Sequence, residues 1–191
     1  MKAVGRLMTL MFIAFFLTGC AGDGGKRMDT FSYVDLERFM GDWYVVASIP
    51  TFLEKGAHNA VESYALNPDG TIATTFRFNK DSYDGPIKTY RPTGFVVDRK
   101  TNARWGMQFI WPIKADYRII YLDDDYQLTV IGRAKRDYVW VMSRKPDFSN
   151  EEFDRVKDFI QGVGYDASML RRVPQREGVN EYNPGANRTT N

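Results

Sequence analysis

The sequence predicts an all-β domain with one flanking helix, whose body is an eight-stranded antiparallel up-and-down β-barrel. Short segments of alternating apolar and polar residues follow one another from Trp43 to Arg144. The connections between them are short and contain turn residues, as in Asn-Pro-Asp-Gly at positions 67–70. A single segment with helical spacing comes after the last of them. Consecutive strands with short loops bury their faces and hide their edges most economically when the sheet closes on itself.

The strands are expected in the order in which the alternating segments occur. Residues 71–78 alternate most clearly, because Ile72, Thr74, Phe76 and Phe78 share one face. The next segment should bend, since Pro92 interrupts it and proline cannot donate to a sheet ladder. The expected strands span residues 43–49, 59–66, 71–78, 88–98, 104–111, 116–122, 126–133 and 137–144.

One helix is expected directly after the barrel. Ser149 and Glu152 form a capping box, and apolar residues follow from Phe153 to Val163 at helical spacing. Gly162 and Gly164 should end the helix. Its apolar stripe is expected to pack on the outside of the barrel, followed by a short strand near residues 170–173.

The first twenty residues predict export. A basic start, an apolar stretch over residues 7–17 and small residues before Cys20 describe a secretory signal that is too short to span a membrane comfortably. Leu17-Thr18-Gly19-Cys20 resembles the lipobox of bacterial lipoproteins, which implies that Cys20 becomes the lipidated first residue of the mature protein. The alternative is an ordinary signal peptide that ends near a cysteine. Cys20 is the only cysteine of the chain, so it has no disulfide partner within it.

Composition and charge narrow the function classes. The net charge of +2 gives no indication of a nucleic-acid surface, and the single histidine, His58, argues against a histidine-rich metal site. No nucleotide-binding, zinc-binding or hydrolase motif occurs, so no catalytic residue, metal or cofactor is predicted. The expected organisation is a signal peptide over residues 1–19, a lipidated tether over 20–30, the barrel with its helix over 31–173 and a disordered tail over 174–191.

Three local patterns occur in an order typical of one family. Gly41-Asp42-Trp43-Tyr44 opens the first strand, the segment 117–123 with Tyr126 covers the sixth and seventh strands, and the segment 138–146 ends the eighth. Together they resemble the three signature regions of the lipocalins, in particular the bacterial lipoprotein lipocalins and the apolipoprotein-D-like group. Asp124-Asp125 departs from the usual second region, which leaves the alignment of that turn open.

The resemblance implies a binding function at a membrane. The expected ligand is a hydrophobic small molecule, a fatty acid or a lysophospholipid. Ala21, rather than aspartate, follows Cys20, which by the same resemblance favours the outer membrane on its periplasmic side. The oligomeric state is left open. The alternatives are a lipocalin-fold enzyme acting on a lipophilic substrate and an envelope interaction module.

Trp43 and Arg144 are expected to close the floor of the barrel. An indole at the start of a strand fills a wide hole, and a guanidinium can lie over its ring while it donates to nearby carbonyls. Strand alternation from this pair then defines the interior. The residues expected to line a ligand cavity are Val45, Ala47, Phe76, Phe78, Trp105, Met107, Phe109, Tyr138, Trp140 and Met142.

Three questions stay open from the sequence. Eight strands make a barrel that either fills itself with side chains or holds one small ligand, so the inward aromatic residues fit a solid core as well as a cavity. Phe52 and Leu53, in the first loop, are expected at the cavity mouth, or else tucked onto the barrel rim. Tyr138 or Arg118 is a candidate for contact with a polar headgroup, although Arg118 fits a solvent-facing position equally well.

Overall fold

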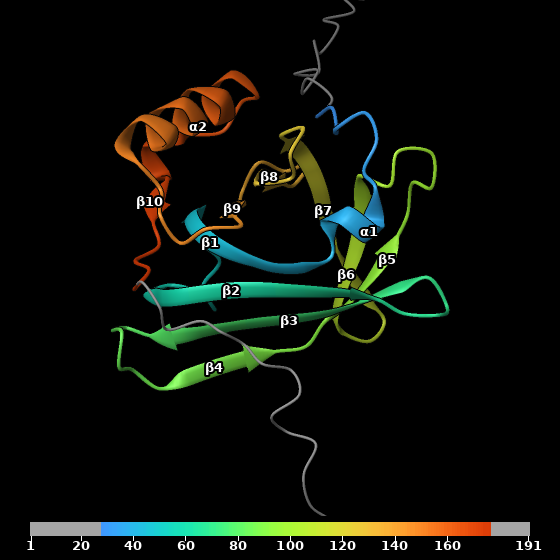
Figure 1. The fold of residues 1–191 in the computed structure, drawn as a ribbon, viewed down its shortest axis with the longest axis horizontal. Coiled ribbons are helices and arrows are strands. Elements are labelled where there is room, and N and C mark those ends of the chain that lie inside the picture. The colour runs from blue at the N-terminus through green and yellow to red at the C-terminus, as the bar shows by residue number, and fades with distance from the viewer. Residues whose placement is uncertain (1–27, 177–191) are drawn as a thin grey trace, which may run out of the picture.

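The computed structural model describes residues 28–176, so the predicted signal peptide, Cys20 and most of the predicted tether lie outside the described residues. Ten strands build one antiparallel sheet (Figure 1). They are β1 (Gly41–Ile49), β2 (Ala57–Leu66), β3 (Thr71–Lys80), β4 (Ile87–Tyr90), β5 (Thr93–Val96), β6 (Arg104–Ile110), β7 (Ile113–Leu122), β8 (Leu128–Gly132), β9 (Val139–Ser143) and β10 (Arg171–Arg172).

The sheet closes into the predicted eight-stranded barrel. From β1 to β9, each strand pairs with the next except that β4 does not pair with β5. β1 pairs with both β2 and β9, which joins the two ends of the sheet. β4 and β5 both pair with β3 and together occupy one strand position of the barrel, because this strand is interrupted at Pro92. β10 adds a two-residue pairing to β1. The eight positions are therefore those predicted, with the expected interruption in the fourth.

A β-bulge in β1 alters the predicted interior. Val45 pairs with Met142 and Ala47 pairs with Val141, so Val46 is an extra residue in the ladder. The alternation reverses there, and Ala47 packs outside the barrel with Val46, while Ser48 shares its face with Trp140. The expectation that Ala47 lines the interior is therefore wrong, because simple alternation does not survive an extra residue.

Two helices complete the fold. The short α1 (Leu36–Phe39) precedes β1, and the side chain of Asp35 caps its N-terminus. α2 (Asn150–Gly162) begins with the predicted capping box of Ser149 and Glu152 and lies against the outside of the barrel near β1 and β9 (Figure 1). A single 3-10 turn, η1 (Ala167–Met169), joins it to β10. No helix within residues 28–176 is long and apolar enough to cross a membrane.

The domain extends beyond the boundaries expected from sequence. Met28 is buried in the apolar cluster between α2 and the outside of the barrel. At the other end, Gln175 donates to the carbonyls of Val45 and Ala60, and the Arg176 backbone N–H donates to Asn59. Composition assigns residues 174–176 to a disordered tail, but they are bound to β1 and β2 of the barrel through these hydrogen bonds.

Candidate functional site

The closed end of the barrel rests on a contact between Trp43 and Arg144. The guanidinium carbon of Arg144 lies 3.8 Å from the centroid of the Trp43 ring, and the indole Nε1 donates to the carbonyl of Phe39 at 2.8 Å. Arg144 Nη2 donates to the carbonyls of Arg38, Phe39 and Met40 at 2.8–3.1 Å. These carbonyls belong to the C-terminal end of α1, where a helix has no partners of its own for them.

Gly41 allows this arginine to come close. Its φ of +93° lies in the left-handed region, and a Cβ at this position would stand 3.3 Å from Arg144 Nη1. The same nitrogen donates to the carbonyl of Asp42 at 2.7 Å. Burial lowers the pKa of Arg144 to about 10, which leaves the side chain charged at neutral pH. The glycine and tryptophan of the Gly-x-Trp pattern are thus both explained by the position of one guanidinium.

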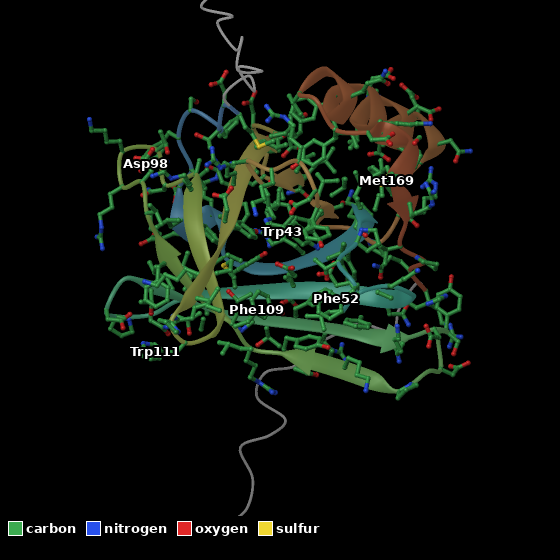
Figure 2. All side chains as sticks on the ribbon, turned by 180° about the vertical axis from the view of Figure 1, so that it is seen from behind. Trp43, Phe52, Asp98, Phe109, Trp111 and Met169 are labelled. Atoms are coloured by element: carbon green, nitrogen blue, oxygen red, sulfur yellow. The ribbon has the colours of Figure 1, made fainter. Side chains whose placement is uncertain are left out.

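A cavity of about 250 Å³ lies above this floor. Apolar and aromatic side chains form most of its wall, including Phe76, Met107, Tyr138 and Trp140. In Figure 2, Trp43 lies near the middle of the barrel, while Phe109 and Trp111 lie toward the tip of the β6–β7 hairpin. The interior is therefore not a solid core, because side chains pack around Trp43 while open space remains toward the mouth.

The first loop forms one side of the mouth. Phe52 and Leu53 line the cavity, and Phe52 is 81% exposed. Beside them, the Glu54 carboxyl turns inward, where it accepts from Trp140 Nε1 at 2.6 Å and from Thr51 Oγ1 at 2.9 Å. Burial raises the pKa of Glu54 above its ordinary value, although both hydrogen bonds oppose the shift. The loop is thus tied to the barrel wall through Glu54 and Trp140, while its apolar tip stays open to solvent.

The deep end of the cavity is polar. Glu62, which stands opposite Trp43 across the β1–β2 ladder, accepts a hydrogen bond from the Tyr64 hydroxyl. The Tyr64 hydroxyl also meets that of Tyr117 at 2.7 Å. Burial raises the pKa of Glu62 to about 7, and the nearby Glu54 adds to the shift. Burial likewise raises the pKa of both tyrosines, so they stay protonated and serve as hydrogen-bond donors.

Comparison with known proteins places this architecture in a family. A model of the lipocalin-like domain matches residues 34–175, which is most of the chain and the whole barrel. The chain belongs to the lipocalins. They bind hydrophobic ligands.

Relatives of this lipocalin occur in very different organisms. It is 32% identical to temperature-induced lipocalin-1 of Arabidopsis thaliana, over 83% of this chain and 88% of the relative. It is 26% identical to the outer membrane lipoprotein Blc of Escherichia coli K12, over 85% and 92%, and 27% identical to apolipoprotein D of Mus musculus, over 74% and 77%.

Solved structures agree on the fold. Insecticyanin from the tobacco hornworm Manduca sexta superimposes with a TM-score of 0.62 at 13% identity, covering 78% of this chain and 85% of that one. The cockroach allergen Per a 4 gives a TM-score of 0.58 at 18% identity, covering 77% and 92%. At these identities the likeness supports the barrel and says nothing of the ligand.

The cavity of this lipocalin gathers part of the predicted lining. The predicted residues that border the open space are Phe52, Leu53, Phe76, Met107, Phe109, Tyr138 and Trp140. Phe109 is half exposed, so it forms rim rather than wall. Four others face the interior but do not border the open space. Val45, Trp105 and Met142 pack toward the floor, whereas Phe78 packs against Phe76 and Tyr90.

The predicted lining left out the polar residues, although alternation places Thr74 on the same face as Phe76. Glu62, Thr74 and Tyr117 border the cavity, as does Glu54. The available signal was the register of the first hairpin, because the residue opposite Trp43 must share its inward face. Loop length alone does not give that register when β2 contains a bulge between His58 and Val61.

Charged groups collect near the mouth. Arg133 lines the cavity there, with its guanidinium 5.2 Å from the centroid of the Tyr138 ring and Nη1 3.4 Å from Asp137. Arg118 is held by Asp116 at 2.9 Å and does not border the cavity. Of the two predicted headgroup candidates, the structure thus places Tyr138 at the cavity and Arg118 beside it. Within residues 28–176, no group of three or more His, Cys, Asp or Glu side chains is placed to hold a metal ion.

Proposed function

We propose that this lipocalin binds a fatty acid or a lysophospholipid and stores or transports it in the cell envelope. The observation that carries the proposal is a cavity open at one end, with a mainly apolar wall, above a floor sealed by Trp43 and Arg144. About ten buried methylene groups would contribute about 8 kcal/mol, which is the scale of micromolar binding before the costs of association.

The mouth offers partners for the headgroup of such a ligand. Arg133 supplies a cation at the rim, and its Nε is buried without a partner among the described residues. Tyr138 supplies a hydroxyl next to it. A carboxylate or phosphate at the rim would meet both groups while its chain follows the apolar wall inward.

Membrane attachment through Cys20 completes the proposal. The lipobox-like sequence before Cys20 supports acylation, and Ala21 favours the outer membrane on its periplasmic side. The Escherichia coli relative is itself named an outer membrane lipoprotein. An anchor of this kind would hold the carrier beside the bilayer from which its ligand comes.

Lipid analysis of the purified protein tests this function. We expect native mass spectrometry to find bound lipid, and we expect a fluorescent fatty acid to bind and to be displaced by unlabelled chains. Ala115→Phe, which fills the cavity from β7, should abolish both signals. Ala73→Phe is the matched control, because Ala73 is exposed on the outer face of β3. A protein that stays empty, or that binds equally after Ala115→Phe, would contradict the proposal.

A further inference from the structure

The deep end of the cavity contains a buried hydroxyl whose hydrogen-bonding capacity is unused among the described residues. Thr74 is only 4% exposed and borders the cavity, and its Oγ1 has no hydrogen-bond partner within residues 28–176. Glu62 borders the same cavity and accepts a hydrogen bond from the Tyr64 hydroxyl through Oε2. A buried hydroxyl without a partner costs about 1–3 kcal/mol, so a group that satisfied it would gain binding energy.

These two side chains point into the same space. Tyr64 pairs with Thr74 and Glu62 pairs with Phe76, so Glu62 and Thr74 occupy diagonal positions on the inner face of neighbouring strands. Diagonal neighbours stand about 7–8 Å apart at the backbone. Side chains projecting inward from such positions lie on two sides of one part of the cavity.

Charge disfavours an ionic occupant at this end below about pH 7, where Glu62 is mostly protonated. Arg133, at the rim, is the one cation among the described residues that line the cavity. A carboxylate or phosphate at the deep end would lie beside Glu62 with no opposite charge. An ammonium would require Glu62 to ionise against its raised pKa, and both charges would be desolvated.

An uncharged hydroxyl meets every requirement of the site. It accepts one hydrogen bond and donates another, as does the Thr74 hydroxyl. The Glu62 carboxyl, with its pKa raised to about 7, is able to donate from Oε1 when protonated. The other carboxyl oxygen accepts from the Tyr64 hydroxyl, which in turn meets the hydroxyl of Tyr117.

We propose that the space between Glu62 and Thr74 is a subsite for an uncharged hydroxyl group carried by a hydrophobic chain. The proposal rests on the proposed binding function and adds to it the chemical class of the buried group. It distinguishes hydroxylated or alcohol lipids from plain fatty acids, which would leave Thr74 Oγ1 unsatisfied.

Three chains of equal length test the subsite. The probes are 12-hydroxydodecanoate, dodecanoate and 12-aminododecanoate, which share the carboxylate and differ at the far end of the chain. Each is used to displace a fluorescent fatty acid at about pH 6, where a carboxyl with a pKa of about 7 is mostly protonated. We expect the hydroxylated chain to displace the probe at about tenfold lower concentration than either of the others. Thr74→Val is nearly isosteric and should remove most of this preference. Thr75→Val, on the opposite face of β3, is the matched control and should leave it unchanged.

Substitutions at Glu62 separate charge from hydrogen bonding. Glu62→Gln keeps a neutral polar group and should keep the preference for the hydroxylated chain, whereas Glu62→Leu should abolish it. Equal displacement by all three chains, or a Thr74→Val effect that is the same for all three, would overturn the subsite and leave the binding function standing. Strongest displacement by 12-aminododecanoate would overturn it in favour of a cation site. If none of the chains displaces the probe, the binding function fails together with the subsite.

Discussion

The guanidinium of Arg144 contacts Trp43 and the C-terminal end of α1 at the same time. It lies over the indole ring and donates to backbone carbonyls at the end of α1 and at the start of β1. One side chain, directly after the end of β9, thereby holds the Trp43 ring, the end of α1 and the start of β1 together. Because these contacts lie below the open cavity, they stabilise the fold without touching a ligand.

Replacing Arg144 should therefore lower stability more than binding. Arg144→Ala removes the ring contact and leaves several buried carbonyls without donors, which we expect to cost about 2–4 kcal/mol of unfolding free energy. Arg144→Lys keeps the charge but loses the planar set of donors. Its unfolding free energy should therefore lie between those of the native protein and Arg144→Ala. Urea unfolding measures the loss. An unchanged midpoint together with lost lipid binding would instead make Arg144 a ligand residue.

Two tryptophans test where packing ends and open space begins. Trp105 is 1% exposed and lies in the packed part of the interior, whereas Trp140 borders the cavity. Trp105→Ala should cost about 3–5 kcal/mol of unfolding free energy, as expected for a void in a core. Trp140→Ala should cost clearly less and should change lipid affinity, because it removes cavity wall and the donor to Glu54. Equal losses of stability with unchanged affinity for both variants would favour a solid interior.

The Glu62 carboxyl should make stability fall as pH rises. Its pKa is raised from 4.5 to about 7 in the folded state, so the folded state binds the proton more tightly than the unfolded state. The contribution is fully present below about pH 4.5 and is lost progressively up to about pH 7. Glu62→Gln removes this dependence. As the pH rises from about 4.5 to about 7, the unfolding free energy of the variant should increase relative to that of the native protein by on the order of 3 kcal/mol.

Unfolding free energies at about pH 5 and about pH 8 measure this difference. The groups around Glu62 are the hydroxyls of Tyr64 and Tyr117 and the carboxyl of Glu54, whose own pKa is raised. A difference between Glu62→Gln and the native protein that stays constant with pH would show that Glu62 titrates as an ordinary exposed carboxyl.

Loss of the Cys20 thiol should release the protein from membranes. Cys20→Ser removes the group that would be acylated, and we expect the barrel to fold and to appear in the soluble fraction. A single acyl chain gives only marginal membrane binding, so firm attachment of the native protein predicts more than one chain at its mature terminus. Membrane fractionation and intact-mass measurement check both points. A variant that stays bound as firmly as the native protein would exclude Cys20 as the anchor.

The sequence predicted the barrel because its signals are local. Alternation, the turn at 67–70, the capping box at Ser149 and the break at Pro92 each depend on a few neighbouring residues, and the structure confirms all of them. The Trp43–Arg144 contact was also predictable, because the fold brings the start of the first strand next to the end of the last one.

The polar interior was not predictable in the same way. Glu62 faces inward because of the β1–β2 register, which a bulge in β2 helps to set, and Ala47 faces outward because of the bulge in β1. Extra residues of this kind come from closing a twisted sheet, and no short stretch of sequence shows them. The depth of the cavity depends on how far the side chains above Trp43 fill the barrel, which is a property of all strands together.

The bulge at Val46 divides β1 between two sources of rigidity. Below it, Trp43 and Val45 are braced from inside the barrel; above it, Ala47 and Ile49 are braced from outside by the cluster that includes Val156 and Ile160 of α2. The loop that carries Phe52 leaves from this upper half. The helix α2 therefore supports the strand end next to the cavity mouth from outside the barrel. Weakening its packing would make the mouth more mobile and leave the closed end of the barrel intact.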